Sequence, residues 1–153
     1  MDGNPDNVWM AVILTLGLGL LVGLIHAFLI NEFNLSPFVV TFASLFILQG
    51  ISLTITTKPI GRASRDFLML YSQKFLGVPI IVYYFIFITL LITFLLRKTV
   101  FGKHIYAIGG NLSVAQLSGI PVKRVRYGVY GLCSVLAAST GLLWLMRMGV
   151  GDP

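Results

Sequence analysis

Four long apolar runs restrict what this chain of 153 residues can fold into. The first covers residues 8–30 and holds one histidine, His26, but no charged side chain. At about 1.5 Å per helical residue, a run of this length crosses a bilayer core of about 30 Å. Further runs cover residues 37–56, 80–96 and 127–146. We therefore predict an all-α fold, a polytopic membrane helix bundle with about four transmembrane helices.

The composition agrees with a membrane protein. Charged residues make up 10% of the chain and hydrophobic residues 57%, whereas about a quarter of a soluble domain is charged. No Asp or Glu lies inside a predicted span. The formal net charge of +6 does not indicate nucleic-acid binding, because the basic residues flank apolar runs, where membrane topology accounts for them. The single cysteine, Cys133, excludes a disulfide within the chain.

Two of the runs carry small residues at helical spacing, in the first and fourth predicted spans. Such faces let the backbones of two helices approach closely. We predict close helix packing along the faces formed by Gly19, Gly23 and Ala27 and by Gly131, Ser134, Ala138 and Gly141.

The second span, 37–56, has a sharply defined start at Pro37, a residue that suits the first helical position. At about 100° per residue, its polar side chains share one face about 140° wide. These hydroxyls and one amide can line a wet path, bond to neighbouring helices, or bond back to their own backbone. The residues of this candidate substrate path are Thr41, Ser44, Gln49, Ser52 and Thr56.

A basic stretch, residues 97–126, separates the third and fourth spans. It holds six of the eleven Lys and Arg residues and no carboxylate. If the four spans alternate across the membrane, the connector 31–36 lies on the same side as 97–126, and the segment 58–79 lies on the other side. The first side then carries six basic residues and the second side four. Because basic loops favour the cytoplasm, six against four favours a cytoplasmic position for 97–126.

Turn and capping signals lie in the middle of this stretch. The sequence Gly109-Gly110-Asn111 predicts a turn, because Gly and Asn accept positive φ. Ser113 and Gln116 fit a capping box, and Gly119 and Pro121 fit the end of the helix that follows. A helix of one or two turns is not stable alone, so it must dock onto the membrane, its own spans or a partner.

The order of residues at 101–122 resembles a known cytoplasmic loop. Phe-Gly-Lys-His-Ile-Tyr-Ala-Ile-Gly-Gly-Asn, followed by Ala115 and Ser118-Gly119-Ile120, is similar to the loop in permease subunits of bacterial monosaccharide ABC importers. These are the importers of the ribose, xylose, arabinose and galactose type. Residues 34–41, 48–50 and 131–147 also match, so the resemblance covers most of the chain.

The resemblance implies a permease subunit that takes up a pentose or hexose across the bacterial inner membrane, a lipid bilayer. It implies as partners an ABC ATP-binding subunit, a periplasmic sugar-binding protein and a second permease subunit, alike or different. It implies no cofactor on this chain, since ATP and Mg²⁺ bind the ATPase subunit. It also implies that a short helix couples the permease to that subunit, through Gly109, Gly110, Asn111, Val114, Ala115, Leu117, Ser118 and Gly119.

The chain departs from the family pattern at both ends. Family members have further spans, with a Gly/Asp/Leu/Ser-rich motif upstream and an acidic, Ala- and Gly-rich motif downstream. We therefore expect residues 1–153 to form a partial permease domain. Two alternatives stay open: a permease for another small solute, such as branched-chain amino acids, and a structural membrane fragment without transport activity.

The sequence does not favour an enzyme. An intramembrane active site needs paired carboxylates, a metal-binding set or a Ser/His pair at membrane depth, and the only histidines are His26 and His104. The sequence has no Gly-x-x-x-x-Gly-Lys-Ser/Thr motif for ATP, so we expect ATP hydrolysis on a partner subunit.

Overall fold

The computed structural model of the chain describes residues 6–55, 74–75 and 77–148. Among the predicted site residues, Thr56 lies outside this part, and so does most of the basic segment 58–79. The described elements, in order, are α1 (Asp6–Glu32), α2 (Pro37–Ile55), β1 (Lys74–Phe75), β2 (Val78–Pro79), α4 (Ile80–Lys98), α5 (Val100–Gly110), α6 (Leu112–Leu117) and α7 (Val122–Met148).

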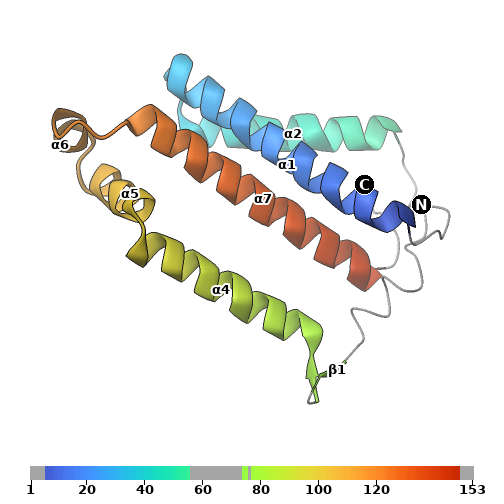
Figure 1. Ribbon diagram of the computed structural model, residues 1–153. Coiled ribbons are helices and arrows are strands. Elements are labelled where there is room, and N and C mark those ends of the chain that lie inside the picture. Colours follow the sequence, from blue (N-terminus) through green and yellow to red (C-terminus); the bar gives the residue numbers. More distant parts are fainter. Residues whose placement is uncertain (1–5, 56–73, 76, 149–153) are drawn as a thin grey trace.

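Helices α1, α2, α4 and α7 are each long and apolar enough to cross a membrane. The predicted all-α bundle of four such helices is confirmed. The strands β1 and β2 have two residues each and pair antiparallel. In Figure 1, α7 lies between α1 and α4, and α2 lies beside α1. The end of α1 and the start of α7 lie together near α6, so segments 31–36 and 97–126 share one end of the bundle (Figure 1).

The two predicted close-packing faces meet between α1 and α7. A Cβ atom added at Gly19 would lie 2.6 Å from Cβ of Ala138, and one added at Gly23 would overlap Ser134. Ala27 is completely buried. Gly141 has open space around its Cα, so it lies outside the close contact. Small residues on both helices thus let the two backbones come together.

Helix boundaries differ from the predicted ones at the end of the bundle near α6. α1 continues through Asn31 and Glu32, which were predicted as connector, and stops before Asn34, whose φ is 50°. α7 starts at Val122 rather than at residue 127. The predicted bounds followed the apolar residues, but helices extend beyond an apolar run where good helix formers flank it, as Glu32 does after the first run and Lys123 and Arg124 do before the fourth. The predicted start of α2 at Pro37 is confirmed.

The buried core of the described part sits at this same end. Its apolar members are Ala27, Ile30, Val40, Ala115, Val122 and Val125. Along α4 no residue is buried, and large side chains such as Phe85 and Phe94 are exposed. Such surface is suited to lipid or to further helices and not to water.

Candidate functional site

A sharp corner joins α4 to α5 at Thr99. The Thr99 hydroxyl donates to the carbonyl oxygen of Leu95 at 2.5 Å and accepts from the backbone N–H of Gly102 at 3.2 Å. The same side chain therefore ends α4 and caps α5. Gly102 is buried, and a Cβ there would overlap the backbone carbonyl of Leu96, so this position requires a glycine.

The apolar face of α5 packs on α7 through Phe101. A Cβ added at Gly128 would lie 2.7 Å from Cε2 of the Phe101 ring, so the glycine makes room for the ring. The Phe-Gly pair of the sequence motif thus has a physical role on each side. Phe101 holds α5 against α7, and Gly102 lets the start of α5 pack closely against the backbone at the end of α4.

The turn predicted at Gly109-Gly110-Asn111 is wrong for its two glycines, which form the last residues of α5. Asn111 is the residue that leaves the helix, with φ −155° and ψ 113°. Its Oδ1 accepts from the backbone N–H of Val114 at 3.2 Å, so Asn111 caps α6. The predicted N-cap, Ser113, therefore lies two residues after the observed one, because Asn is as good an N-cap residue as Ser and comes first in the chain.

The predicted end of α6 is confirmed. Gly119 has φ +76°, a conformation that costs little only for glycine. The N–H of Gly119 donates to the carbonyl of Gln116 at 3.0 Å, and the N–H of Ile120 to that of Ala115 at 3.1 Å. This pair of bonds is the Schellman motif, and Pro121 follows it.

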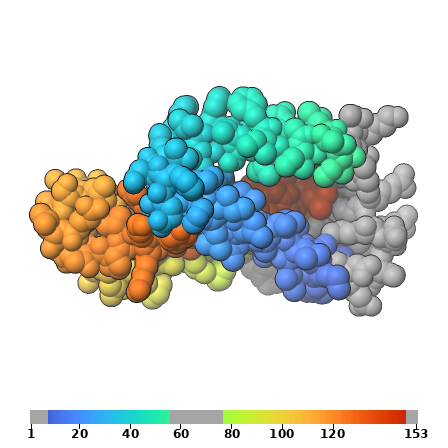
Figure 2. Space-filling view, turned by 90° about the horizontal axis from the view of Figure 1, so that it is seen from above, coloured from blue at the N-terminus to red at the C-terminus, as the bar shows by residue number. Residues whose placement is uncertain are grey.

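Both ends of α6 are therefore fixed, and the helix buries Ala115 while it leaves its larger apolar side chains Val114 and Leu117 exposed. Ala115 is 2% exposed, whereas Leu117 is 89% and Val114 57% exposed. In Figure 2 the segment that holds α5 and α6 projects beyond the ends of α1 and α2. Lys103 of the neighbouring α5 is exposed as well. Exposed apolar side chains on a projecting segment are suited to contact with another protein or with the membrane.

A cleft of about 550 Å³ opens between α1, α2 and α7. Small and apolar residues form most of its wall, and polar groups come from His26, Thr41, Tyr130 and Ser134. His26 Nε2 lies 2.6 Å from the hydroxyl of Ser44, which joins α1 to α2. The wall is mostly apolar, and the Ser134 hydroxyl donates to the backbone carbonyl of Gly131 at 3.0 Å, so few polar groups of this cleft are available to a solute.

The predicted substrate-path residues on α2 do not all face this cleft. Thr41 lines it and Ser44 bonds to the lining His26, whereas Gln49 is exposed and lies outside the lining. Ser52 is half-buried. The hydroxyls of Thr41 and Ser44 also donate to their own helix, to the carbonyls of Pro37 at 2.9 Å and Val40 at 2.8 Å.

His26 was not among the predicted path residues. The signal that could have found it is that it is an ionisable side chain within an apolar span.

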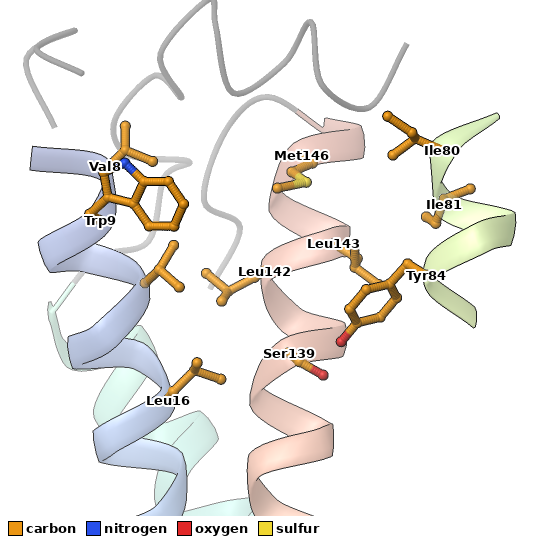
Figure 3. A pocket seen from close by; sticks show the side chains of 11 residues that line it. Val8, Trp9, Leu16, Ile80, Ile81, Tyr84, Ser139, Leu142, Leu143 and Met146 are labelled. Atoms are coloured by element: carbon orange, nitrogen blue, oxygen red, sulfur yellow. The ribbon is translucent and has the colours of Figure 1, made fainter. Parts of the chain in front are cut away.

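A second cavity, of about 370 Å³, lies toward the opposite end between α1, α4 and α7. Figure 3 shows Trp9 and Leu16 of α1, Tyr84 of α4 and Leu142 and Met146 of α7 around it. Its wall is almost entirely apolar. A sugar would lose its hydrogen bonds to water there without replacement, so this cavity does not suit one.

The sequence was compared with protein families and with individual known proteins. The family described as "Branched-chain amino acid transport system / permease component" matches residues 2–153. The protein named "Probable ABC transporter permease protein YphD", from Escherichia coli, is 39% identical over 78% of this chain and 36% of its own length. The L-arabinose ABC transporter permease protein AraH of Azospirillum brasilense is 33% identical over 86% of this chain and 39% of its own length.

The ribose import permease protein RbsC of Escherichia coli is 28% identical over 99% of this chain and 49% of its own length. The chain thus spans between about a third and a half of the curated relatives it matches. No solved structure matches it. With the family match over residues 2–153 and four apolar helices, this chain is a multi-pass membrane protein that belongs to the ABC transport permease family.

Proposed function

We propose that this chain forms part of the transmembrane permease of an ATP-driven importer for a monosaccharide in the bacterial inner membrane. ATP hydrolysis takes place on a separate ATP-binding subunit, a periplasmic binding protein delivers the sugar, and a second permease subunit completes the passage. The observation that carries the proposal is α6: a short helix fixed at both ends that presents Leu117 and Val114 outward. Family membership supports the ATP-binding subunit as its partner.

Relatives support a sugar as the solute, although the family description names branched-chain amino acids. Relatives are named as a ribose import permease, an L-arabinose ABC transporter permease and a fructose import permease. The few polar groups of the mostly apolar cleft are hydroxyls, a thiol and an imidazole, and none of the described residues that line it has a carboxylate or a cationic side chain. A zwitterionic amino acid needs charged or helix-terminal partners, whereas a sugar needs hydrogen bonds.

The coupling role is tested with Leu117→Asp in the importer assembled with its ATP-binding subunit in proteoliposomes. A carboxylate at this 89%-exposed position puts a charge into the proposed apolar contact, so we expect loss of solute-stimulated ATPase activity. Leu117→Met keeps an apolar side chain of similar volume and should retain the stimulation. Normal stimulation in Leu117→Asp would refute the coupling role.

The solute is tested by uptake of labelled ribose, L-arabinose, fructose and leucine into the same vesicles. We expect uptake of at least one sugar and none of leucine. Uptake of leucine alone would favour the branched-chain amino acid alternative.

A further inference from the structure

Polar contacts join the last turn of α1 to the first turn of α7, beside the exit from α6. Lys123 Nζ lies 3.0 Å from each carboxylate oxygen of Glu32. Asn31 donates from Nδ2 to the backbone carbonyl of Lys123 at 3.3 Å. We define the three residues Asn31, Glu32 and Lys123 as the α1–α7 clasp.

Asn31 is a polar residue within the apolar core at this end. Only 5% of it is exposed, and its Oδ1 is buried without a hydrogen-bond partner. Ile30, Val122 and Val125 are also buried there. An unpaired buried acceptor opposes folding, and an apolar side chain of the same size would not carry that cost. Stability therefore does not account for this asparagine, whereas its bond across the two helices indicates a positioning role.

The ion pair of the clasp is open to solvent. The side chain of Lys123 is 63% exposed and that of Glu32 43% exposed. Exposed ion pairs contribute little to stability, because water screens the charges and two long side chains lose freedom. With both carboxylate oxygens engaged, however, the pair fixes the direction in which the start of α7 meets the end of α1.

The clasp lies on the route from α6 to the cleft. Only residues 118–121 separate α6 from α7, and the N–H of Val122 donates to the carbonyl of Ile120 at 2.8 Å. Glu32 ends α1, the helix whose His26 is bonded to Ser44 of α2. Figure 1 shows the end of α1 and the start of α7 side by side next to α6.

From this placement we infer that the clasp passes a displacement of α6 on to α1 and α2, so that the cleft changes when the ATPase moves. The inference rests on the proposed function, which makes α6 the docking element. Close packing holds α1 and α7 together along their length, and the clasp fixes the direction of that contact at the end where the chain passes from α6 into α7. Asn31, Glu32 and Lys123 are positioning residues, since none of them lines the cleft or belongs to the exposed apolar face of α6.

The test measures solute transported per ATP hydrolysed, in proteoliposomes that hold the assembled importer. Lys123→Glu and Asn31→Leu should each lower this ratio by about two- to thirtyfold, the range for substitutions that carry coupling. Binding of the ATP-binding subunit and basal ATPase activity should stay unchanged. Asn31→Leu removes the unpaired acceptor at similar volume, so it keeps the test valid if the charge reversal fails to fold.

Two further variants separate the clasp from a general charge effect. Exchange of both charges, Glu32→Lys with Lys123→Glu, should restore the ratio. Arg124→Glu makes the same charge reversal at the next residue, which is also exposed, and should leave the ratio unchanged. An unchanged ratio in Lys123→Glu and Asn31→Leu, no recovery on exchange, or an equal fall in Arg124→Glu would each overturn the inference.

Leu117→Asp in the same assay distinguishes this failure from failure of the proposed function. Stimulation that survives Leu117→Asp refutes the coupling role of α6 itself. Stimulation that is lost in Leu117→Asp, with a normal ratio in the clasp variants, refutes the clasp alone.

Discussion

Substitution of Gly19 by alanine tests the contact between α1 and α7 most directly. The added Cβ would lie 2.6 Å from Cβ of Ala138, whereas ordinary contacts begin at 3.4 Å. The helices would have to separate by about 0.8 Å here, and the backbone oxygen of Ser134, 3.1 Å away, limits a sideways shift. Overpacking of this kind costs about 1–3 kcal/mol, which is about 5- to 150-fold in the folding equilibrium.

The assay is equilibrium unfolding of the purified chain in mixed micelles, with increasing mole fraction of a denaturing detergent. Gly17→Ala is the matched control in the same helix, because nothing lies within 4 Å of the added Cβ. Alanine is the better helix former by about 1 kcal/mol, so this control should be neutral or slightly stabilising. Gly19→Ala should therefore unfold at clearly lower detergent than Gly17→Ala.

A double-mutant cycle completes the test. Ala138→Gly removes the nearest atom, so in the Gly19→Ala background it should recover most of the lost stability. Equal midpoints for Gly19→Ala and Gly17→Ala, or no recovery with Ala138→Gly, would refute the packing argument.

Three further outcomes are expected. Gly119→Ala should raise the free energy of the C-terminal turn of α6 by about 1–2 kcal/mol, because φ is +76°, and should speed proteolysis around residue 119. Thr99→Val should lower the free energy of unfolding by about 1 kcal/mol, since it removes the cap of α5, and Thr99→Ser should largely keep it; equal midpoints in the micelle assay would contradict this. Thr41→Val should reduce sugar uptake more than Gln49→Leu, because Thr41 lines the cleft and Gln49 does not; the reverse order would contradict the assignment of the passage.

Apolar length and spacing were sufficient to predict the bundle. Four spans, the start of α2 at Pro37 and the close-packing faces of α1 and α7 follow from hydropathy and from small residues at helical intervals. The C-terminal end of α6 was equally predictable, because Gly119 and Pro121 permit few other conformations.

The elements between α4 and α7 were harder to predict for local reasons. The Gly109-Gly110 pair indicates a turn by propensity, but α5 is fixed on α7 by Phe101 and continues through both glycines. Tertiary packing therefore overrode propensity there. The orientation of the polar face of α2 depends on where α1 and α7 lie, which the periodicity of one helix cannot give. The pairing of Asn31 and Glu32 with Lys123, about ninety residues apart, has no local signal.

The uneven distribution of the core has a mechanical consequence. The buried residues gather where α1, α2 and α7 meet near α6, while α4 has no buried residue. A helix the length of α7 extends about 40 Å at 1.5 Å per residue. If the packed end acts as the fulcrum, a tilt of about 5° there displaces the far end by about 3.5 Å, comparable to the width of a water molecule. Because α1 packs closely on α7 as far as Ala138, α1 would move together with α7, whereas α4, which has no buried residue, is held less tightly.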